Sequence, residues 1–395
     1  MRVAGLFAGI GGFELGLHRA GHVTELVCDV LPTSEAVLRA RFPSVEYRDD
    51  IKRLRSLPAS VELVCAGFPC QDLSQAGRTA GIGGDRSGLV AEVFRLLSRR
   101  RVPTVVVENV PFMLQLDGGS AIRSIVAEFE RRGYRWAYRV VDSWGFGLAQ
   151  RRERVFLVAS RVLDPADVLL VDDVAVERPK TALGARAHGF YWTEGLGGLG
   201  WAVDAVPTLK NGSTIGIASP PAVLMPDGRI LKLGIRAGEQ LQGFEPDWTD
   251  PAQSVAPPSA RWGLVGSAVS APVAEWIGHR LTTPGRYAGN RDRLFPAIGK
   301  APRAARFDGR KRFAVDIGVD PVGRRPPPLA DFLRFDEPVL LSAKATAGFL
   351  GRTRRARLRF EPGFIDAVER HLTAVGGSLA DVPSPAQVEL DLVSL

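Results

Sequence analysis

One cysteine lies in a sequence context where a thiol can do chemistry. Cys70 follows an apolar run, residues 61–66, that is short enough to be a buried strand of a parallel sheet. Gly67 and Pro69 end that strand, so we expect Cys70 on a loop at its carboxyl end, where open α/β sheets present reacting groups. A thiolate there would be a nucleophile, whereas Cys65 inside the run would be inert. The alternative is a small apolar residue in a tight turn.

A carboxyl group and two guanidinium groups occupy comparable positions. The apolar run 104–107 ends in Glu108, and parallel strands bring their carboxyl ends to one edge. The sequence therefore predicts that Glu108 faces the same pocket as Cys70, since a purely structural Glu there would need a salt bridge or water. Arg152 and Arg154 precede another apolar run. They could hold phosphates, polarise a carbonyl oxygen, or form a solvated face.

The elements that would position these groups begin at the amino terminus. Residues 1–17 predict a strand, a glycine-rich turn and a helix. Gly9 and Gly11 would let the backbone approach a ligand beside the free N–H groups of the helix start, or would serve tight packing. Asp29 and Asp50 end the next two strands; they suit ribose hydroxyls and a purine amino group, or a helix cap and a solvated turn. This alternation predicts a doubly wound α/β fold.

The composition limits the class of protein. The 395 residues suffice for two or three domains, and 45% hydrophobic with 24% charged residues is typical of a soluble globular protein. The chain has no apolar run of about 18 residues and no signal peptide, so no membrane association is expected. Three cysteines, all within the first 70 residues, exclude a disulfide framework or zinc cluster and fit a reducing cytoplasm. The net charge of +8 suits a polyanionic partner.

Four motifs, in their order along the chain, resemble those of the DNA (cytosine-5)-methyltransferases. They are Phe7-Ala8-Gly9-Ile10-Gly11-Gly12, Gly67-Phe68-Pro69-Cys70-Gln71, Glu108-Asn109-Val110 and Gln150-Arg151-Arg152-Glu153-Arg154. The resemblance covers residues 1–160 and 235–281. It implies that these ranges form a Rossmann-like S-adenosylmethionine-dependent methyltransferase domain and that residues 161–234 form a smaller target-recognition domain. Residues 282–395 would be a basic C-terminal extension.

The resemblance also implies roles for individual residues. Cys70 would add to carbon 6 of a flipped-out cytosine, Glu108 would protonate or polarise the ring, and Arg152 and Arg154 would hold the carbonyl or a flanking phosphate. S-adenosyl-L-methionine would contact Phe7, Gly9, Ile10, Gly11, Asp29, Val30, Asp50, Ile51, Phe68, Ser267 and Val269. DNA would contact Gln71, Ser74 and Gln150.

Three positions depart from the family pattern. Gly5 stands where many members have Asp, Ala237 where Glu is expected, and Ser267 where Asn is expected. We expect weaker cofactor contact or local rigidity there, and not a dead site. The departures keep a non-catalytic DNA-binding module open as an alternative. An RNA cytosine-5 methyltransferase, which would use the same Cys70 and Glu108, is the other alternative.

Target choice is expected to come from residues 161–234, whose Gly, Pro and Thr predict short strands and loops. The extension carries a basic stretch, 352–359, and a predicted helix over 362–375 with Phe364 and Val368 on its apolar face. Either a general contact to DNA phosphates or a solvated face would fit the arginines. We expect a cytoplasmic monomer that acts on double-stranded DNA in bacterial modification linked to restriction or phage defence. A nuclease or defence-system protein is a candidate partner.

Overall fold

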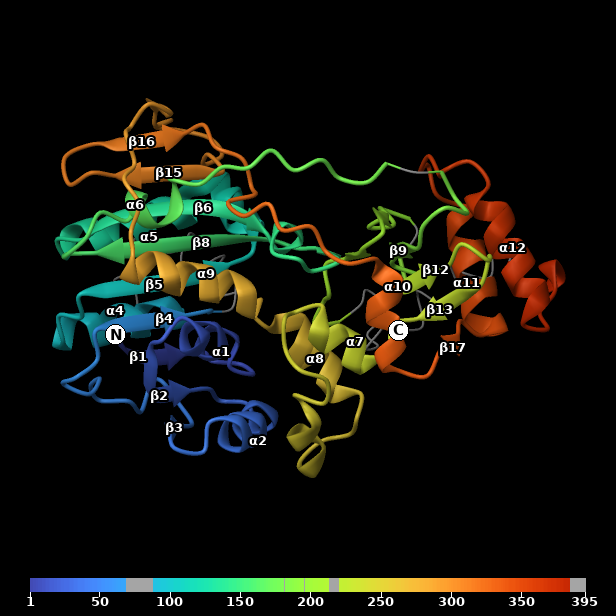
Figure 1. Cartoon of the computed structure of the whole chain (residues 1–395), viewed down its shortest axis with the longest axis horizontal. Coiled ribbons are helices and arrows are strands. Elements are labelled where there is room, and N and C mark those ends of the chain that lie inside the picture. Colours follow the sequence, from blue (N-terminus) through green and yellow to red (C-terminus); the bar gives the residue numbers. More distant parts are fainter. Residues whose placement is uncertain (69–87, 181, 195, 213–219, 384–395) are drawn as a thin grey trace.

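The computed structural model describes residues 1–68, 88–180, 182–194, 196–212 and 220–383, which form a larger and a smaller lobe (Figure 1). A ten-stranded mixed sheet, in the order β14-β16-β15-β6-β8-β5-β4-β1-β2-β3, runs through the larger lobe. Its strands are β1 (Arg2–Leu6), β2 (Val23–Cys28), β3 (Glu46–Arg48), β4 (Leu63–Ala66), β5 (Thr104–Asn109), β6 (Arg135–Asp142), β8 (Glu153–Ser160), β14 (Asp292–Leu294), β15 (Ala304–Phe307) and β16 (Arg312–Val315). Strands β1 to β5 are parallel, and β8 runs antiparallel between β5 and β6.

Helices cover both faces of this sheet. They are α1 (Gly12–Arg19), α2 (Pro32–Arg41), α4 (Leu89–Arg99), α5 (Ser120–Arg131), α6 (Ala166–Leu169) and α9 (Ala271–Thr282), with the 3-10 turns η1 (Pro111–Leu114), η2 (Leu116–Gly119) and η3 (Ser143–Gly145). Helices α4 and α5 pack on one face, whereas α1, α6 and α9 pack on the other. The predicted Rossmann-like α/β fold is confirmed.

The burial pattern explains these layers. Helix α4 buries Val90, Val93, Phe94 and Leu97, which recur every three or four positions and so form one apolar face. All residues of β4 and β5 are buried, because helices cover both sides of the strands. Cys65 points into this core, where burial raises the pKa of its thiol well above the ordinary value. Cys65 is therefore the inert cysteine that its place in the run predicts.

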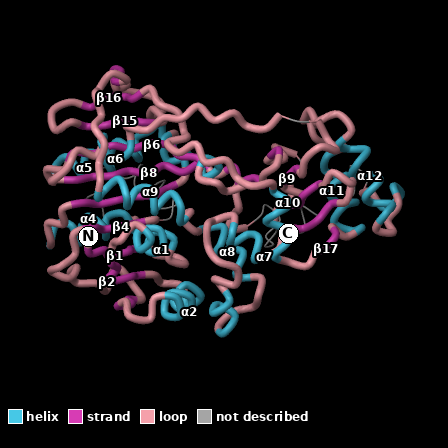
Figure 2. The backbone as a smooth tube through the Cα atoms, in the orientation of Figure 1, coloured by secondary structure: helices cyan, strands magenta, loops and turns pink. Residues whose placement is uncertain are grey.

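The smaller lobe is built on a five-stranded antiparallel sheet in the order β10-β9-β12-β13-β17. Its elements are β9 (His188–Phe190), β10 (Ala202–Val203), β12 (Ala222–Leu224), β13 (Ile230–Lys232), α10 (Leu329–Phe332), η5 (Leu333–Phe335), β17 (Val339–Leu340), α11 (Ala343–Thr353), α12 (Phe364–Ala374) and η6 (Leu379–Asp381). The remaining elements are β7 (Gln150–Arg151), β11 (Val206–Pro207), α7 (Ile235–Gln240), η4 (Asp250–Ser254) and α8 (Ala260–Ser267), of which α7 and α8 lie between the lobes in Figure 1. Figure 2 shows that loops make up much of this lobe, as the composition of residues 161–234 predicts.

The described part of residues 282–395 belongs to both lobes, which differs from the expected separate extension. Strands β14 to β16 continue the central sheet, because the exposed edge of β6 pairs with β15. Strand β17 pairs with β13, and Figure 1 shows α11 and α12 against the strands of the smaller lobe. The predicted helix over 362–375 is present as α12, and its apolar face is buried in this lobe. No helix in the described ranges is long and apolar enough to cross a membrane.

Candidate active site

A cavity of about 1020 Å³ lies at the carboxyl ends of the parallel strands, and residues between the lobes form its far wall. Many of the predicted site residues line it: Phe7, Gly9, Asp29, Val30, Asp50, Ile51, Phe68, Glu108, Arg152, Arg154 and Ser267. The cavity therefore collects side chains from separate strand ends, as expected for an open parallel sheet.

The acidic end of β2 borders this cavity. Asp29 accepts hydrogen bonds from the backbone N–H of Gly9, at 2.8 Å, and of Leu31, at 3.0 Å. Burial raises the pKa of Asp29, although the backbone N–H groups oppose that change. Because a carboxylate oxygen can accept more than one hydrogen bond, Asp29 can hold the glycine-rich turn and still receive ribose hydroxyls.

The turn itself is held from behind by other predicted residues. Ile10 is buried, and its carbonyl accepts a hydrogen bond from the Trp248 indole at 2.8 Å. Gly11 precedes α1 with a φ of 84°, a conformation that favours glycine. The carbonyl of Val269 packs against the backbone of Gly12. Ile10, Gly11 and Val269 thus shape the turn, and their contact with the cofactor stays a prediction.

Glu108 and Arg154 form a buried ion pair at the other end of the cavity. Arg154 Nε lies 3.0 Å from Glu108 Oε1. Burial raises the pKa of Glu108, and the charges of Arg154 and Arg152 only partly oppose it. The pKa of Glu108 therefore lies above its ordinary value, so this carboxyl takes up a proton more readily than an exposed Glu does.

The strand end that carries Glu108 also holds the chain just before Cys70. The Asn109 amide nitrogen donates a hydrogen bond to the carbonyl of Phe68 at 3.0 Å. Phe68 lines the cavity and stands two residues before Cys70 in the chain. Cys70, Gln71 and Ser74 themselves lie outside the described residues.

Arg152 has a different environment from the one expected for a substrate ligand. It is 1% exposed, and its guanidinium donates to the carbonyls of Leu209, Gly266 and Ala268 at 2.7–3.2 Å. These contacts join the residue between β7 and β8 to the segment after β11 and to the end of α8. The terminal nitrogens are thus committed to backbone carbonyls, which leaves Arg154 as the arginine that can face a base.

Gln150 is likewise a correction to the predicted DNA contacts. It is fully buried, its amide nitrogen donates to the carbonyl of Leu241 at 2.8 Å, and its oxygen accepts from the N–H of Leu209 at 2.9 Å. DNA cannot reach a side chain in this position. Gln150 instead fixes the segment that enters the cavity wall.

Sequence reasoning missed that wall, formed in part by Thr208, Leu209, Lys210 and Asn211. Lys210 lies over the ring of Tyr191, 3.9 Å from its centroid, and forms an ion pair with Glu194. The polar run after β11 was visible in the sequence, but its place depends on the parallel pairing of β11 with β7.

The departure at Gly5 has a steric explanation. A Cβ atom at Gly5 would lie 1.8 Å from Oε1 of Glu14, which points from α1 onto the sheet. Glu14 is 1% exposed, and neither carboxyl oxygen has a hydrogen-bond partner among the described residues. Burial raises the pKa of Glu14 from 4.5 to about 7. Glu14 thus occupies the space that an Asp side chain at position 5 would need.

The departure at Ala237 lies next to an acid from a distant segment. Asp336 accepts hydrogen bonds from the backbone N–H of Ala237, at 2.8 Å, and of Arg236, at 3.3 Å. It therefore caps the free N–H groups at the start of α7. Ser267, the third departure, is exposed at the cavity, where its hydroxyl can still donate one hydrogen bond.

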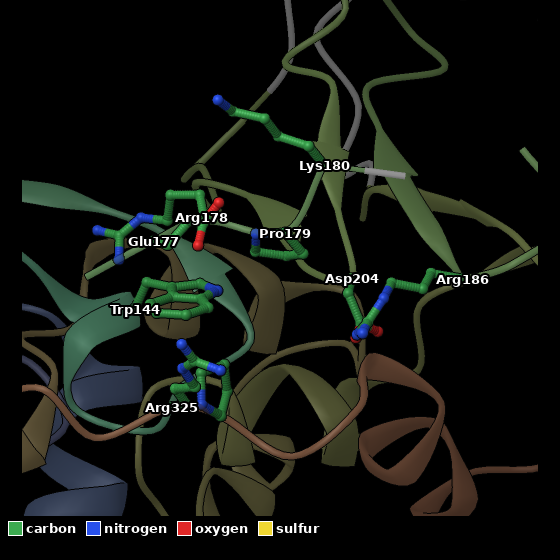
Figure 3. Close-up of a pocket in the computed structure, with 9 residues that line it drawn as sticks. Trp144, Glu177, Arg178, Pro179, Lys180, Arg186, Asp204 and Arg325 are labelled. Atoms are coloured by element: carbon green, nitrogen blue, oxygen red, sulfur yellow. The ribbon is translucent and has the colours of Figure 1, made fainter. Parts of the chain in front are cut away.

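A second cavity, of about 280 Å³, lies at the junction of the lobes (Figure 3). Arg178 forms ion pairs with Asp142 at 2.9 Å and with Asp320 at 2.8 Å, and its guanidinium lies 4.3 Å from the ring centroid of Trp144. These contacts tie the segment that leaves the larger lobe to the segment that returns. The cavity is therefore part of the connection between lobes, and none of the predicted site residues is among the residues that line it.

Comparison with known proteins agrees with this geometry. Residues 1–183 match the family model described as C-5 cytosine-specific DNA methylase. The Type II methyltransferase M2.BsuMI of Bacillus subtilis (strain 168) is 44% identical over 385 residues, which cover 94% of this chain and 98% of that protein. The Type II methyltransferase M.BanI of Aneurinibacillus aneurinilyticus is 35% identical over 159 residues, 39% of this chain and 37% of that protein.

A solved structure shares the fold. The S. pombe Dnmt2 methyltransferase superimposes with a TM-score of 0.54 at 16% identity and covers 71% of this chain and 98% of that one. The Bacillus subtilis relative carries the stronger argument, because it matches almost the full length of both proteins. The chain therefore belongs to the family of C-5 cytosine-specific DNA methylases and is a DNA (cytosine-5)-methyltransferase.

Proposed function

We propose that this enzyme methylates a cytosine flipped out of duplex DNA into the larger cavity, with Cys70 as nucleophile and Glu108 as proton donor. The observation that carries this proposal is the buried pair of Glu108 and Arg154, which lines the same cavity as Phe68, two residues before Cys70. The resemblance to Type II methyltransferases makes protection of DNA from a cognate nuclease the biological role that we favour.

The residues of the cavity suit S-adenosylmethionine. Asp29 and Asp50 end neighbouring strands and can accept hydrogen bonds from hydroxyl and amino groups, while Phe7, Val30 and Ile51 provide apolar surface. The volume of about 1020 Å³ is at the upper end of the usual range for small-molecule sites, which suits a cofactor together with a base. When bound, S-adenosylmethionine supplies an electrophilic methyl group for the carbon 5 that Cys70 activates.

The protein groups act on the base. The Cys70 thiolate forms a bond to carbon 6 while the neutral Glu108 carboxyl gives its proton to N3, so the electron pair reaches carbon 5 as an enamine. Arg154, which Glu108 holds in place, donates a hydrogen bond to the cytosine carbonyl oxygen. This contact orients the ring so that carbon 6 faces Cys70 and N3 faces Glu108. After methylation, carbon 5 loses its proton to solvent water and the bond between carbon 6 and sulfur breaks, which releases the Cys70 thiolate. N3 returns its proton to the Glu108 carboxylate, so the aromatic ring and the starting state of the protein are restored.

DNA is the substrate that the charge and shape support. The cavity opens between two lobes, and the protein carries a net charge of +8, which favours a phosphate backbone. Flipping a base costs a few kcal/mol, which contacts in the cavity and to the phosphates must offset. The smaller lobe is the part that we assign to target choice, because loops on a rigid scaffold can present side chains to base edges.

The test uses purified protein, a tritiated methyl donor and separate pools of duplex DNA and RNA. We expect label in DNA, and bisulfite sequencing should find it at one cytosine of a defined target. Cys70→Ala should abolish transfer, and DNA with 5-fluorocytosine at the target should remain covalently bound to the wild-type protein after denaturation. Label in RNA alone, or full turnover by Cys70→Ala, would refute the proposal.

A further inference from the structure

The segment that follows the methyltransferase motifs completes the core of the smaller lobe. The core cluster combines Phe190, Leu199, Ala222, Leu224 and Ile230 with Leu341, Ala347, Phe349, Leu350, Phe364, Ala367, Val368, Leu372 and Val382. The ring centroid of Phe364 lies 5.2 Å from that of Phe190 and 4.9 Å from that of Trp201. Because most of this cluster comes from residues 341–382, the segment 185–234 cannot bury its apolar surface without them.

Polar contacts join the same two segments in one arrangement. His371 Nδ1 lies 3.2 Å from the backbone nitrogen of Ile230, and its Nε2 lies 2.9 Å from the carbonyl oxygen of Leu341. A neutral ring with its proton on Nε2 satisfies both contacts. This histidine therefore fixes β13 against the start of the C-terminal segment.

One arginine of α11 reaches the segment 191–194, which contacts the wall of the catalytic cavity. Arg352 donates from Nε to the carbonyl of Glu194 at 3.0 Å and from Nη2 to the carbonyl of Trp192 at 2.7 Å. The carboxylate of Glu194 pairs with Lys210, which lines the cavity. The hydroxyl of Tyr191 donates to the carbonyl of Thr208, also on the cavity wall, at 2.5 Å.

We propose that residues 339–382 are half of the target-recognition module and that Arg352 is a positioning residue for the segment 191–194 and, through it, for Lys210. The partner is the duplex DNA at the cavity mouth, so the inference rests on the proposed function. The planar guanidinium of Arg352 donates to two backbone carbonyls at once and so fixes the position of residues 191–194. Glu194 and Tyr191 in turn contact Lys210 and Thr208, so they fix the position of the cavity wall. Sequence choice then depends on the C-terminal segment as well as on residues 185–234.

A matched pair of variants separates positioning from charge. Arg352→Met and Arg354→Met each remove one positive charge from the end of α11. Arg354 pairs with Glu369 on α12, and among the described residues it forms no hydrogen bond or ion pair with residues 191–194. The target is first identified by bisulfite sequencing of plasmid DNA. KM and kcat are then measured on that duplex and on duplexes with one base changed, at low and high salt.

We expect Arg352→Met to raise KM and to reduce discrimination against the changed duplexes by about tenfold each, with a smaller change in kcat. The KM and the discrimination of Arg354→Met should stay within about twofold of the wild-type values. Arg352→Lys keeps the charge and a hydrogen-bond donor, so its KM and discrimination should lie between those of wild type and Arg352→Met. If Arg352→Met does not fold by circular dichroism, Arg352→Lys takes its place, and its loss of discrimination must exceed that of Arg354→Met.

If Arg352→Met and Arg354→Met change KM and discrimination equally, and both changes depend on salt, α11 supplies only positive charge. That result would overturn the inference. Unchanged discrimination by Arg352→Met or Arg352→Lys would overturn it as well. An inactive wild-type protein would refute the proposed function itself, whereas an active wild-type protein with unaltered variants refutes only this inference.

Discussion

Replacing Glu14 by Gln should change how the stability of the protein depends on pH. In the folded protein, burial between α1 and the central sheet raises the pKa of Glu14 from 4.5 to about 7. As the pH rises between these values, the Glu14 carboxyl loses its proton in the unfolded chain but keeps it in the folded chain. The folded state therefore loses stability as the pH rises, and the loss is complete above about pH 7.

The size of the effect follows from the two pKa values. One pKa unit corresponds to about 1.4 kcal/mol, so a shift from 4.5 to about 7 costs about 3–4 kcal/mol in full, and most of this cost falls between pH 5 and pH 8. Gln has a similar shape and does not titrate. The free energy of unfolding of Glu14→Gln, relative to wild type, should therefore increase by about 2–3 kcal/mol over this range.

Urea unfolding at several pH values, followed by circular dichroism and tryptophan fluorescence, measures this difference. Glu35→Gln, on the outer side of α2, is the matched control because Glu35 pairs with Arg39 on the surface and should contribute little. If the free energy of unfolding varies with pH in the same way for wild type and Glu14→Gln, the buried carboxyl is not held neutral. Such a result would refute the reasoning about Gly5 and Glu14.

Three further perturbations test other parts of the structure. Asp29→Ala should weaken binding of S-adenosylmethionine by about 1–3 kcal/mol, because ribose hydroxyls and the N–H of Gly9 lose an acceptor, and calorimetry that finds unchanged affinity would contradict this role. Glu108→Gln should lower kcat by about 10²- to 10⁴-fold while a gel-shift assay finds target DNA still bound; near-normal turnover would remove Glu108 from proton transfer. Deleting residues 285–395 should expose the core of the smaller lobe and the edge of β6, so the truncated protein should aggregate or unfold. A truncated protein that folds and methylates the same target would instead support the simpler expectation of an accessory extension.

That last prediction reverses what the sequence indicates, and the reason is long-range pairing. The arginines at 352–359 and the proline-rich connector before them are typical of an accessory segment. The sequence cannot reveal that β15 pairs with β6 or that Phe364 packs on Phe190, because these contacts join residues more than 150 positions apart. Local patterns predicted the helix α12 but not the surface that it covers.

The sequence alone determined which strand ends carry chemistry. Apolar runs closed by Gly, Pro, Asp or Glu mark buried parallel strands, and parallel strands deliver their carboxyl ends to one edge, so Asp29, Asp50 and Glu108 could be assigned to one site. Only the tertiary structure decided which neighbouring polar groups remain available to a ligand. Arg152 and Gln150 stand in the same motif as Arg154, yet backbone carbonyls and an N–H from distant segments occupy them. A buried polar group must find a partner, and that partner is set by the packing of the whole chain and not by the residues beside it.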